Sequence, residues 1–141
     1  MKKLIAIVDD DRAVRDALQR MLQTHGFATA VFASAEEFLS RAKVRSTFCL
    51  ILDVRMPGMT GLALHDYLVG KGFRIPTILI TACPTRREER RAIASGAASY
   101  LAKPLSEELL LDTIREVLED GGQAEGAASL PRPDRHIEDL V

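Results

Sequence analysis

The sequence predicts an α/β protein with a doubly wound, five-stranded parallel sheet and five helices. Short apolar runs alternate with helical patterns five times along the chain, which is the signature of repeated strand-helix units on a parallel sheet. The three central runs are apolar with almost no alternation, as expected where helices cover both faces of a sheet. Four of the runs end in polar residues, and the carboxyl ends of neighbouring strands converge on one crevice in such a sheet.

The strands are predicted from runs of four or five apolar and β-forming residues that end at turn-forming or polar residues. Their expected positions are residues 4–8, 28–32, 49–52, 77–81 and 99–102.

The first two helices carry recognisable start and stop signals. Apolar residues follow Asp11 at helical spacing, and Gly26 can adopt the left-handed conformation that ends a helix. Ser34 and Glu37 have the spacing of a capping box, which predicts that the second helix starts just after the second strand.

The last three helices follow the third, fourth and fifth strands. The third is expected over residues 61–69, where it is stopped by Gly70. Thr85 and Glu88 form a second capping-box pair at the start of the fourth helix. Ser106 opens the fifth helix, which has an apolar stripe at helical spacing.

Length and composition indicate one domain. With 141 residues, 47% of them hydrophobic and 28% charged, the chain can bury one substantial core. We expect the domain to occupy residues 1–120. Residues 121–141 are predicted to be a flexible tail, because the segment starts with several small residues and Pro131 and Pro133 prevent a continuous helix.

Charge and targeting signals limit the partners and the location. A formal net charge of -1 provides no basic surplus for binding nucleic acid. The apolar run over residues 4–8 stops at three aspartates and is too short for a signal peptide or a membrane span, so we expect a cytoplasmic protein with no membrane contact. The two cysteines form no disulfide framework, and Cys49 is interpreted as a core residue.

Asp53 is the most informative residue, because it has polar counterparts at the ends of three other apolar runs. These counterparts are the Asp9-Asp10 pair, Thr81 and Lys103. Three carboxylates in one crevice repel each other unless a cation joins them, and Mg²⁺ favours a few carboxylates together with water and phosphate oxygens. A carboxylate next to a cation and a lysine is a plausible acceptor for a phosphoryl group.

Four short motifs together resemble the receiver domain of two-component response regulators. They are Asp9-Asp10, Asp53 followed by Met56-Pro57-Gly58, Thr81-Ala82 and Lys103-Pro104. The resemblance extends from about Lys3 to Glu119, and residues 53–61 are most similar to FixJ-type regulators. It implies a flavodoxin-like topology with strand order 2-1-3-4-5. It also implies that the protein signals through protein contacts.

The resemblance implies a role for each acidic residue. Asp53 would accept the phosphoryl group from a sensor histidine kinase or a histidine phosphotransfer protein. Asp10 and Asp53 would bind Mg²⁺ directly, Asp9 would bind it through water, and the backbone carbonyl of Arg55 would be a further ligand.

The remaining site residues would neutralise the negative charge of the phosphoryl group and change position in response to it. Lys103 would neutralise the phosphoryl oxygens, and its bond to Pro104 is expected to be cis. Thr81 would donate a hydrogen bond to one phosphoryl oxygen. Tyr100 resembles the switch aromatic of the family, and the face made by the fourth helix, fifth strand and fifth helix would contact a partner, including a second copy of the chain.

Several features have two interpretations. By resemblance, Arg55 and Cys83 flank the path of hydrolytic water, and Arg55 can either shield the acyl phosphate or order the attacking water. The fourth helix carries arginines with i, i+4 spacing around Glu88 and Glu89, which indicates either a solvated face with internal ion pairs or a docking patch for an acidic partner. His65 is interpreted as a helix-surface residue.

Two alternatives remain for the protein as a whole. The chain is either a stand-alone receiver or the receiver half of a longer DNA-binding transcription regulator, and the 141 residues favour the first. A phosphatase of the haloacid dehalogenase type also uses a strand-end aspartate, Mg²⁺, a hydroxyl and a lysine. That family needs a second acid where this chain has Arg55, so we expect no enzyme activity beyond self-phosphorylation and autodephosphorylation.

Overall fold

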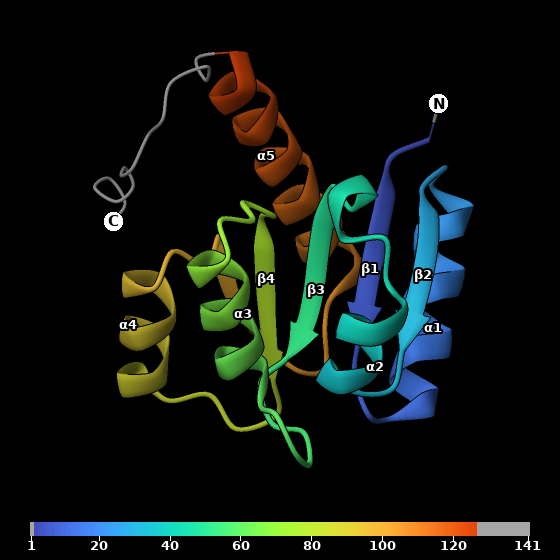
Figure 1. The fold of residues 1–141 in the computed structure, drawn as a ribbon. Coiled ribbons are helices and arrows are strands. Elements are labelled where there is room, and N and C mark those ends of the chain that lie inside the picture. Colours follow the sequence, from blue (N-terminus) through green and yellow to red (C-terminus); the bar gives the residue numbers. More distant parts are fainter. Residues whose placement is uncertain (1, 127–141) are drawn as a thin grey trace.

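A five-stranded parallel sheet forms the centre of the computed structural model, which describes residues 2–126 (Figure 1). The strand order is β2-β1-β3-β4-β5, which confirms the predicted topology. The strands are β1 (Leu4–Val8), β2 (Ala28–Phe32), β3 (Cys49–Asp53), β4 (Thr77–Thr81) and β5 (Ser99–Ala102).

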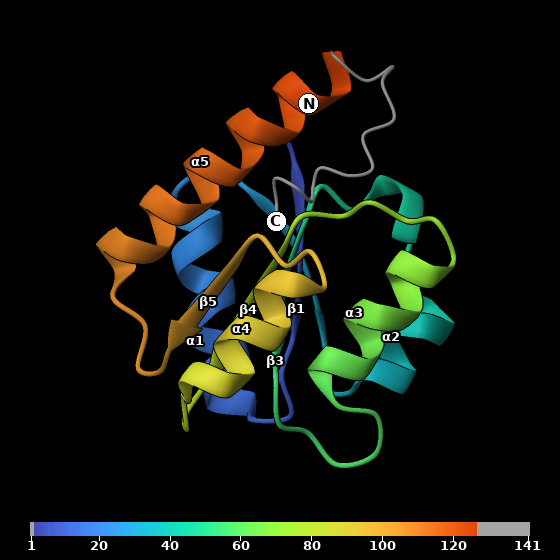
Figure 2. The ribbon, with the colours of Figure 1, turned by 90° about the vertical axis from the view of Figure 1, so that its left-hand side faces the viewer.

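Helices cover both faces of this sheet. Helices α1 and α5 lie on one face, and α2, α3 and α4 lie on the other (Figure 2). The helices are α1 (Arg12–Thr24), α2 (Ala35–Arg41), α3 (Gly61–Gly70), α4 (Arg86–Ala94) and α5 (Glu107–Gly126), with a short 3₁₀ helix, η1 (Val44–Ser46), between α2 and β3. None of the helices within residues 2–126 has the length and apolar character needed to cross a bilayer.

The predicted capping pairs start α2 and α4 as expected: the Ser34 and Thr85 hydroxyls accept from the backbone N–H groups of Glu37 and Glu88. At the start of α1, the Asp11 carboxylate accepts hydrogen bonds from the first turn. After α1, Gly26 has φ 90°, a conformation that favours glycine.

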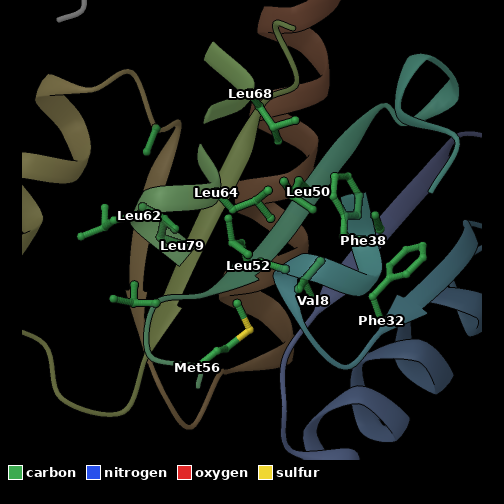
Figure 3. Close-up of a cluster of buried hydrophobic side chains, with 14 of the residues drawn as sticks. Val8, Phe32, Phe38, Leu50, Leu52, Met56, Leu62, Leu64, Leu68 and Leu79 are labelled. Carbon is green, nitrogen blue, oxygen red and sulfur yellow. The ribbon is translucent and has the colours of Figure 1, made fainter. Parts of the chain in front are cut away.

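The core consists of two apolar layers, one on each face of the sheet. Because side chains alternate along a strand, Leu50 and Leu52 of β3 enter the layer under α2 and α3 (Figure 3), whereas Cys49 and Ile51 enter the layer under α1 and α5. Burial raises the pKa of the Cys49 thiol to about 12, so Cys49 is a core residue as predicted.

Three local features differ from the sequence prediction. Helix α5 continues to Gly126, beyond the predicted boundary at residue 120, because glycine only weakens a helix, whereas proline breaks it. The rest of the predicted tail lies outside the described residues, and its flexibility stays a prediction. Helix η1 was not expected. The prediction for His65 was wrong: its ring is buried against α4, where Nδ1 lies 3.3 Å from Ser95 Oγ, and burial lowers its pKa.

Candidate functional site

The carboxyl ends of four strands bring together the polar residues singled out from the sequence. Asp9 directly follows β1 and Asp53 is the last residue of its neighbour β3. Thr81 ends β4 and Lys103 follows β5. These residues are far apart in sequence, and the parallel strand pairing places them at one edge of the sheet.

Three carboxylates face one another at this edge. Oxygen atoms of Asp9, Asp10 and Asp53 all lie within 4.8 Å of one another. The Asp9 and Asp53 side chains are buried, whereas Asp10 is exposed. The Lys103 ammonium lies 2.9 Å from Asp9 Oδ2 and 3.4 Å from Asp53 Oδ2, so one cation is shared between two buried anions.

This arrangement changes the acidity of Asp53 and Lys103. Burial, followed by the negative charge of Asp9, raises the pKa of Asp53 to about 6, although Lys103 acts in the opposite direction. Burial by itself would lower the pKa of Lys103, but the carboxylates of Asp9 and Asp53 outweigh it and raise that pKa above its usual value. Lys103 is therefore a permanent cation at neutral pH.

The acidic residues fit a hard divalent cation. Asp9 Oδ1 accepts a hydrogen bond of 2.9 Å from the Asp11 backbone N–H, and the buried Oδ2 atom has the Lys103 ammonium as its partner at 2.9 Å. One lysine cannot balance three carboxylates, and oxygen ligands of this kind suit Mg²⁺. The position of the Arg55 carbonyl as a further ligand stays a prediction.

The loop after β3 is held close to Asp53 by two residues that the sequence analysis did not assign to the site. A Cβ atom at Gly61 would clash with the backbone carbonyl oxygen of Asp53 and would lie 2.9 Å from its carbonyl carbon, so only glycine allows α3 to start here. Glu36 of α2 anchors the same loop, because its Oε2 atom accepts a hydrogen bond of 2.9 Å from the Met59 backbone N–H. A glycine opening a helical pattern was the available signal for Gly61. Nothing local marked Glu36.

Thr81 and Tyr100 lie on neighbouring strands. Thr81 is fully buried, and its hydroxyl accepts a hydrogen bond of 3.1 Å from the Cys83 backbone N–H. Tyr100 of β5 is half-buried, and its hydroxyl lies at the start of α4. Burial and the carboxylate of Glu88 raise the pKa of Tyr100.

The Arg55 side chain extends from the loop after β3 toward α4. Its backbone N–H donates to Asp53 Oδ1 at 3.4 Å, while its guanidinium pairs with Glu88 Oε2 at 3.2 Å. On the same helix Arg91 pairs with Asp66 of α3 at 3.6 Å. Glu88 and Arg91 thus pair with other elements, not within α4 as one of the two interpretations of this helix had it, because their long side chains reach opposite charges across the surface.

Comparison with known proteins agrees with the fold. The model of the response regulator receiver domain matches residues 5–115. The chain therefore belongs to the receiver domain family of two-component response regulators, as its motifs indicated. This membership removes the phosphatase alternative.

Relatives of known sequence and structure support the same assignment. Response regulator protein TodT of Pseudomonas putida is 40% identical over 115 residues, which are 82% of this chain and 51% of TodT. The solved structure of response regulator StyR has a TM-score of 0.82 at 34% identity and covers 99% of this chain and 67% of StyR. The FixJ-N crystal structure has a TM-score of 0.76 at 34% identity, covering 84% of this chain and 95% of FixJ-N, which supports the FixJ-type resemblance. Nodulation protein W of Bradyrhizobium diazoefficiens is 34% identical over 113 residues, which are 80% of this chain and 50% of that protein. The chain thus spans about half the length of the curated relatives TodT and Nodulation protein W.

Proposed function

We propose that Asp53 accepts a phosphoryl group from the phosphohistidine of a sensor kinase or a phosphotransfer protein, and that the modified protein signals through protein contacts. The observation that carries this proposal is the position of the Asp53 carboxylate. It is buried, lies beside two further carboxylates, and is 3.4 Å from the Lys103 ammonium.

The residues at this edge have complementary roles in the transfer. An Asp53 carboxylate oxygen forms the new bond to phosphorus, the bond from phosphorus to the donor nitrogen breaks, and the imidazole leaves with the electron pair. Lys103 neutralises charge on the transferred oxygens as a point charge. Thr81, next to Ile80 of the Asp53–Ile80 strand pair, donates its hydroxyl to one of those oxygens.

Mg²⁺ is the cofactor that this donor set favours. Asp10 and Asp53 would hold it directly, Asp9 would hold it through water, and the Arg55 backbone carbonyl would complete the protein ligands. When bound, the ion supplies charge neutralisation for the three acidic residues and for the phosphoryl oxygens.

Intact-mass spectrometry after incubation with acetyl phosphate tests this proposal. We expect one phosphoryl adduct in the presence of Mg²⁺ and none after chelation. Asp53→Asn should abolish the adduct, because an amide oxygen is a poor nucleophile, whereas Asp16→Asn on the exposed side of α1 should retain it. The same adduct on Asp53→Asn, or multiple turnover of the donor without a stable adduct, would contradict the proposal.

The output is proposed to pass through Thr81 and Tyr100 to the face made by α4, β5 and α5. A homodimer through this face is one form of that output. A second candidate is that the chain works as the receiver half of a longer DNA-binding regulator. It is supported by the 36% identity over 115 residues with DctD of Rhizobium meliloti, which is described as a transcriptional regulatory protein and of which the match covers 25%.

A further inference from the structure

The start of α4 contains a capping box that is interrupted by a tyrosine. Thr85 Oγ1 accepts a hydrogen bond of 3.0 Å from the Glu88 backbone N–H, which is the usual first half of the motif. In the usual second half, the glutamate would accept from the Thr85 backbone N–H. Here that N–H donates to the Tyr100 hydroxyl at 3.1 Å, and the hydroxyl donates to Glu88 Oε1 at 2.6 Å.

The second oxygen of the Glu88 carboxylate binds Arg55 in the loop after β3. Glu88 Oε2 pairs with the Arg55 guanidinium at 3.2 Å; the Glu88 side chain is 13% exposed and the Arg55 side chain 56% exposed. Arg55 lies two residues after Asp53 and Tyr100 lies on β5. Within the part of the chain that the structure describes, Glu88 is therefore the residue whose side chain forms polar bonds with both Arg55 and Tyr100.

We propose that Glu88 is a positioning residue that holds Arg55 and Tyr100 in the unphosphorylated arrangement and releases both when Asp53 is phosphorylated. We call Arg55, Glu88 and Tyr100 the Glu88 latch. The proposal deepens the proposed function and rests on Asp53 being the phosphoacceptor.

Electrostatic attraction between Arg55 and the phosphoryl group would release Arg55 from Glu88. A phosphoryl group on Asp53 adds negative charge two residues from Arg55 and offers its guanidinium a second anion. Glu88 then loses its counter-charge, and its carboxylate becomes free to turn. Coupling of this kind is reciprocal, so loosening the latch must also favour the modified state of Asp53.

The released arrangement leaves no polar group at the helix start without a partner. Once the Tyr100 hydroxyl moves away, the Glu88 carboxylate can accept directly from the Thr85 N–H and complete the capping box. In the second capping pair of this chain, the glutamate also folds back past the helix start: Glu37 Oε1 accepts at 2.7 Å from the backbone N–H of Ala33, one residue before the cap Ser34. The α4 start thus has two discrete hydrogen-bonded arrangements, as a switch requires.

Glu88→Gln tests the latch, because glutamine keeps the shape and the capping ability but loses the charge that pairs with Arg55. Glu89→Gln is the matched control: it makes the same change one residue further along α4, and the Glu89 side chain is exposed and has no hydrogen bond or ion pair within residues 2–126. The readouts are the NMR signals of the Thr85 amide and the Tyr100 ring in the full chain. They are recorded with Mg²⁺, before and after titration with beryllofluoride as a mimic of the acyl phosphate.

Without beryllofluoride, we expect the Glu88→Gln signals to lie part of the way from the free to the bound wild-type positions. Its half-saturating beryllofluoride concentration should be roughly tenfold lower than that of the wild type, because a hydrogen bond to a charged group is a strong one. Glu89→Gln should match the wild type. Arg55→Ala, which removes the other partner of Glu88, should move the same signals in the same direction.

The latch is wrong if Glu88→Gln keeps the free wild-type signals and the wild-type half-saturation. Failure of the proposed function gives a different result. In that case acetyl phosphate leaves no adduct on the wild type, whereas the Thr85 and Tyr100 signals of free Glu88→Gln still differ from those of Glu89→Gln if the latch is present.

Discussion

Replacement of the buried Asp53 carboxylate by an amide should stabilise the metal-free protein. In Asp53→Asn the side chain keeps its size but no longer places a second negative charge beside Asp9. Most substitutions destabilise a protein, but this one should stabilise it, because the acidic cluster is arranged for ligand binding at the expense of folding.

The size of this stabilisation follows from the raised pKa of Asp53. Raising the pKa of Asp53 from 3.8 to about 6 means that ionising it in the folded protein costs about 3 kcal/mol, at about 1.4 kcal/mol for each tenfold change. Solvent in the crevice screens part of this interaction, so we expect a gain of about 2 kcal/mol in unfolding free energy, or about 6 to 10 °C in Tm.

The pH dependence has a definite sign. Because the folded pKa of Asp53 lies above the unfolded value, the folded state holds the proton more tightly. Wild type therefore loses stability relative to Asp53→Asn as pH rises from 3.8 through about 6. The two proteins should be equally stable below pH 3.8, and the full difference should appear above pH 6.

Urea denaturation with a chelator, at several pH values, measures this difference. Asp16→Asn, an exposed carboxyl on α1, is the control and should change the unfolding free energy by less than about 0.5 kcal/mol. Mg²⁺ should stabilise the wild type and reduce the advantage of Asp53→Asn. An Asp53→Asn protein that is no more stable than wild type at pH 8 would refute the electrostatic reasoning.

Three further predictions concern other parts of the domain. Gly61→Ala should lower the unfolding free energy by more than about 2 kcal/mol, because its Cβ would clash with backbone, whereas Gly70→Ala, with nothing within 4 Å, should be neutral or stabilising; equal urea midpoints would contradict this. Thr81→Ala should still be phosphorylated but should show smaller NMR shifts at Tyr100 and α4 than the wild type, because only the release through Glu88 remains; full wild-type shifts in that variant would show that Thr81 takes no part in the coupling. Burial lowers the pKa of His65, so its contribution to stability is present above its unfolded pKa and is lost as pH falls through the folded one; His65→Gln should flatten this acid-side decline in Tm, and an unchanged decline would contradict it.

Local chemistry made most of the fold predictable. The five strands lie within one residue of their predicted bounds, because each is a short apolar run between polar residues. Helix starts were legible where a side chain caps the backbone, as at Ser34 and Thr85. The errors arose where the local signal was weak: η1 has no side-chain cap, and glycines at the end of α5 did not stop the helix.

The sequence by itself determined which residues gather at the crevice. Asp9, Asp53 and Lys103 each stand at the end of a β-forming run, and a parallel sheet brings such positions to one edge whatever the details of packing. Their chemical types then indicated a cation and a phosphoryl group. No tertiary information was needed for that inference, because it depends on strand ends and on charge.

Only the tertiary structure decided how the surrounding residues are connected. The sequence placed Glu88 among neighbouring arginines, but the folded chain pairs it with Arg55 from one loop and with Tyr100 from another strand. His65 was assigned to the surface and lies buried against α4. The partner of a long side chain depends on which charged groups lie within its reach, and many of these belong to elements that are remote in sequence. Such groups come close only when the helices have packed on the sheet.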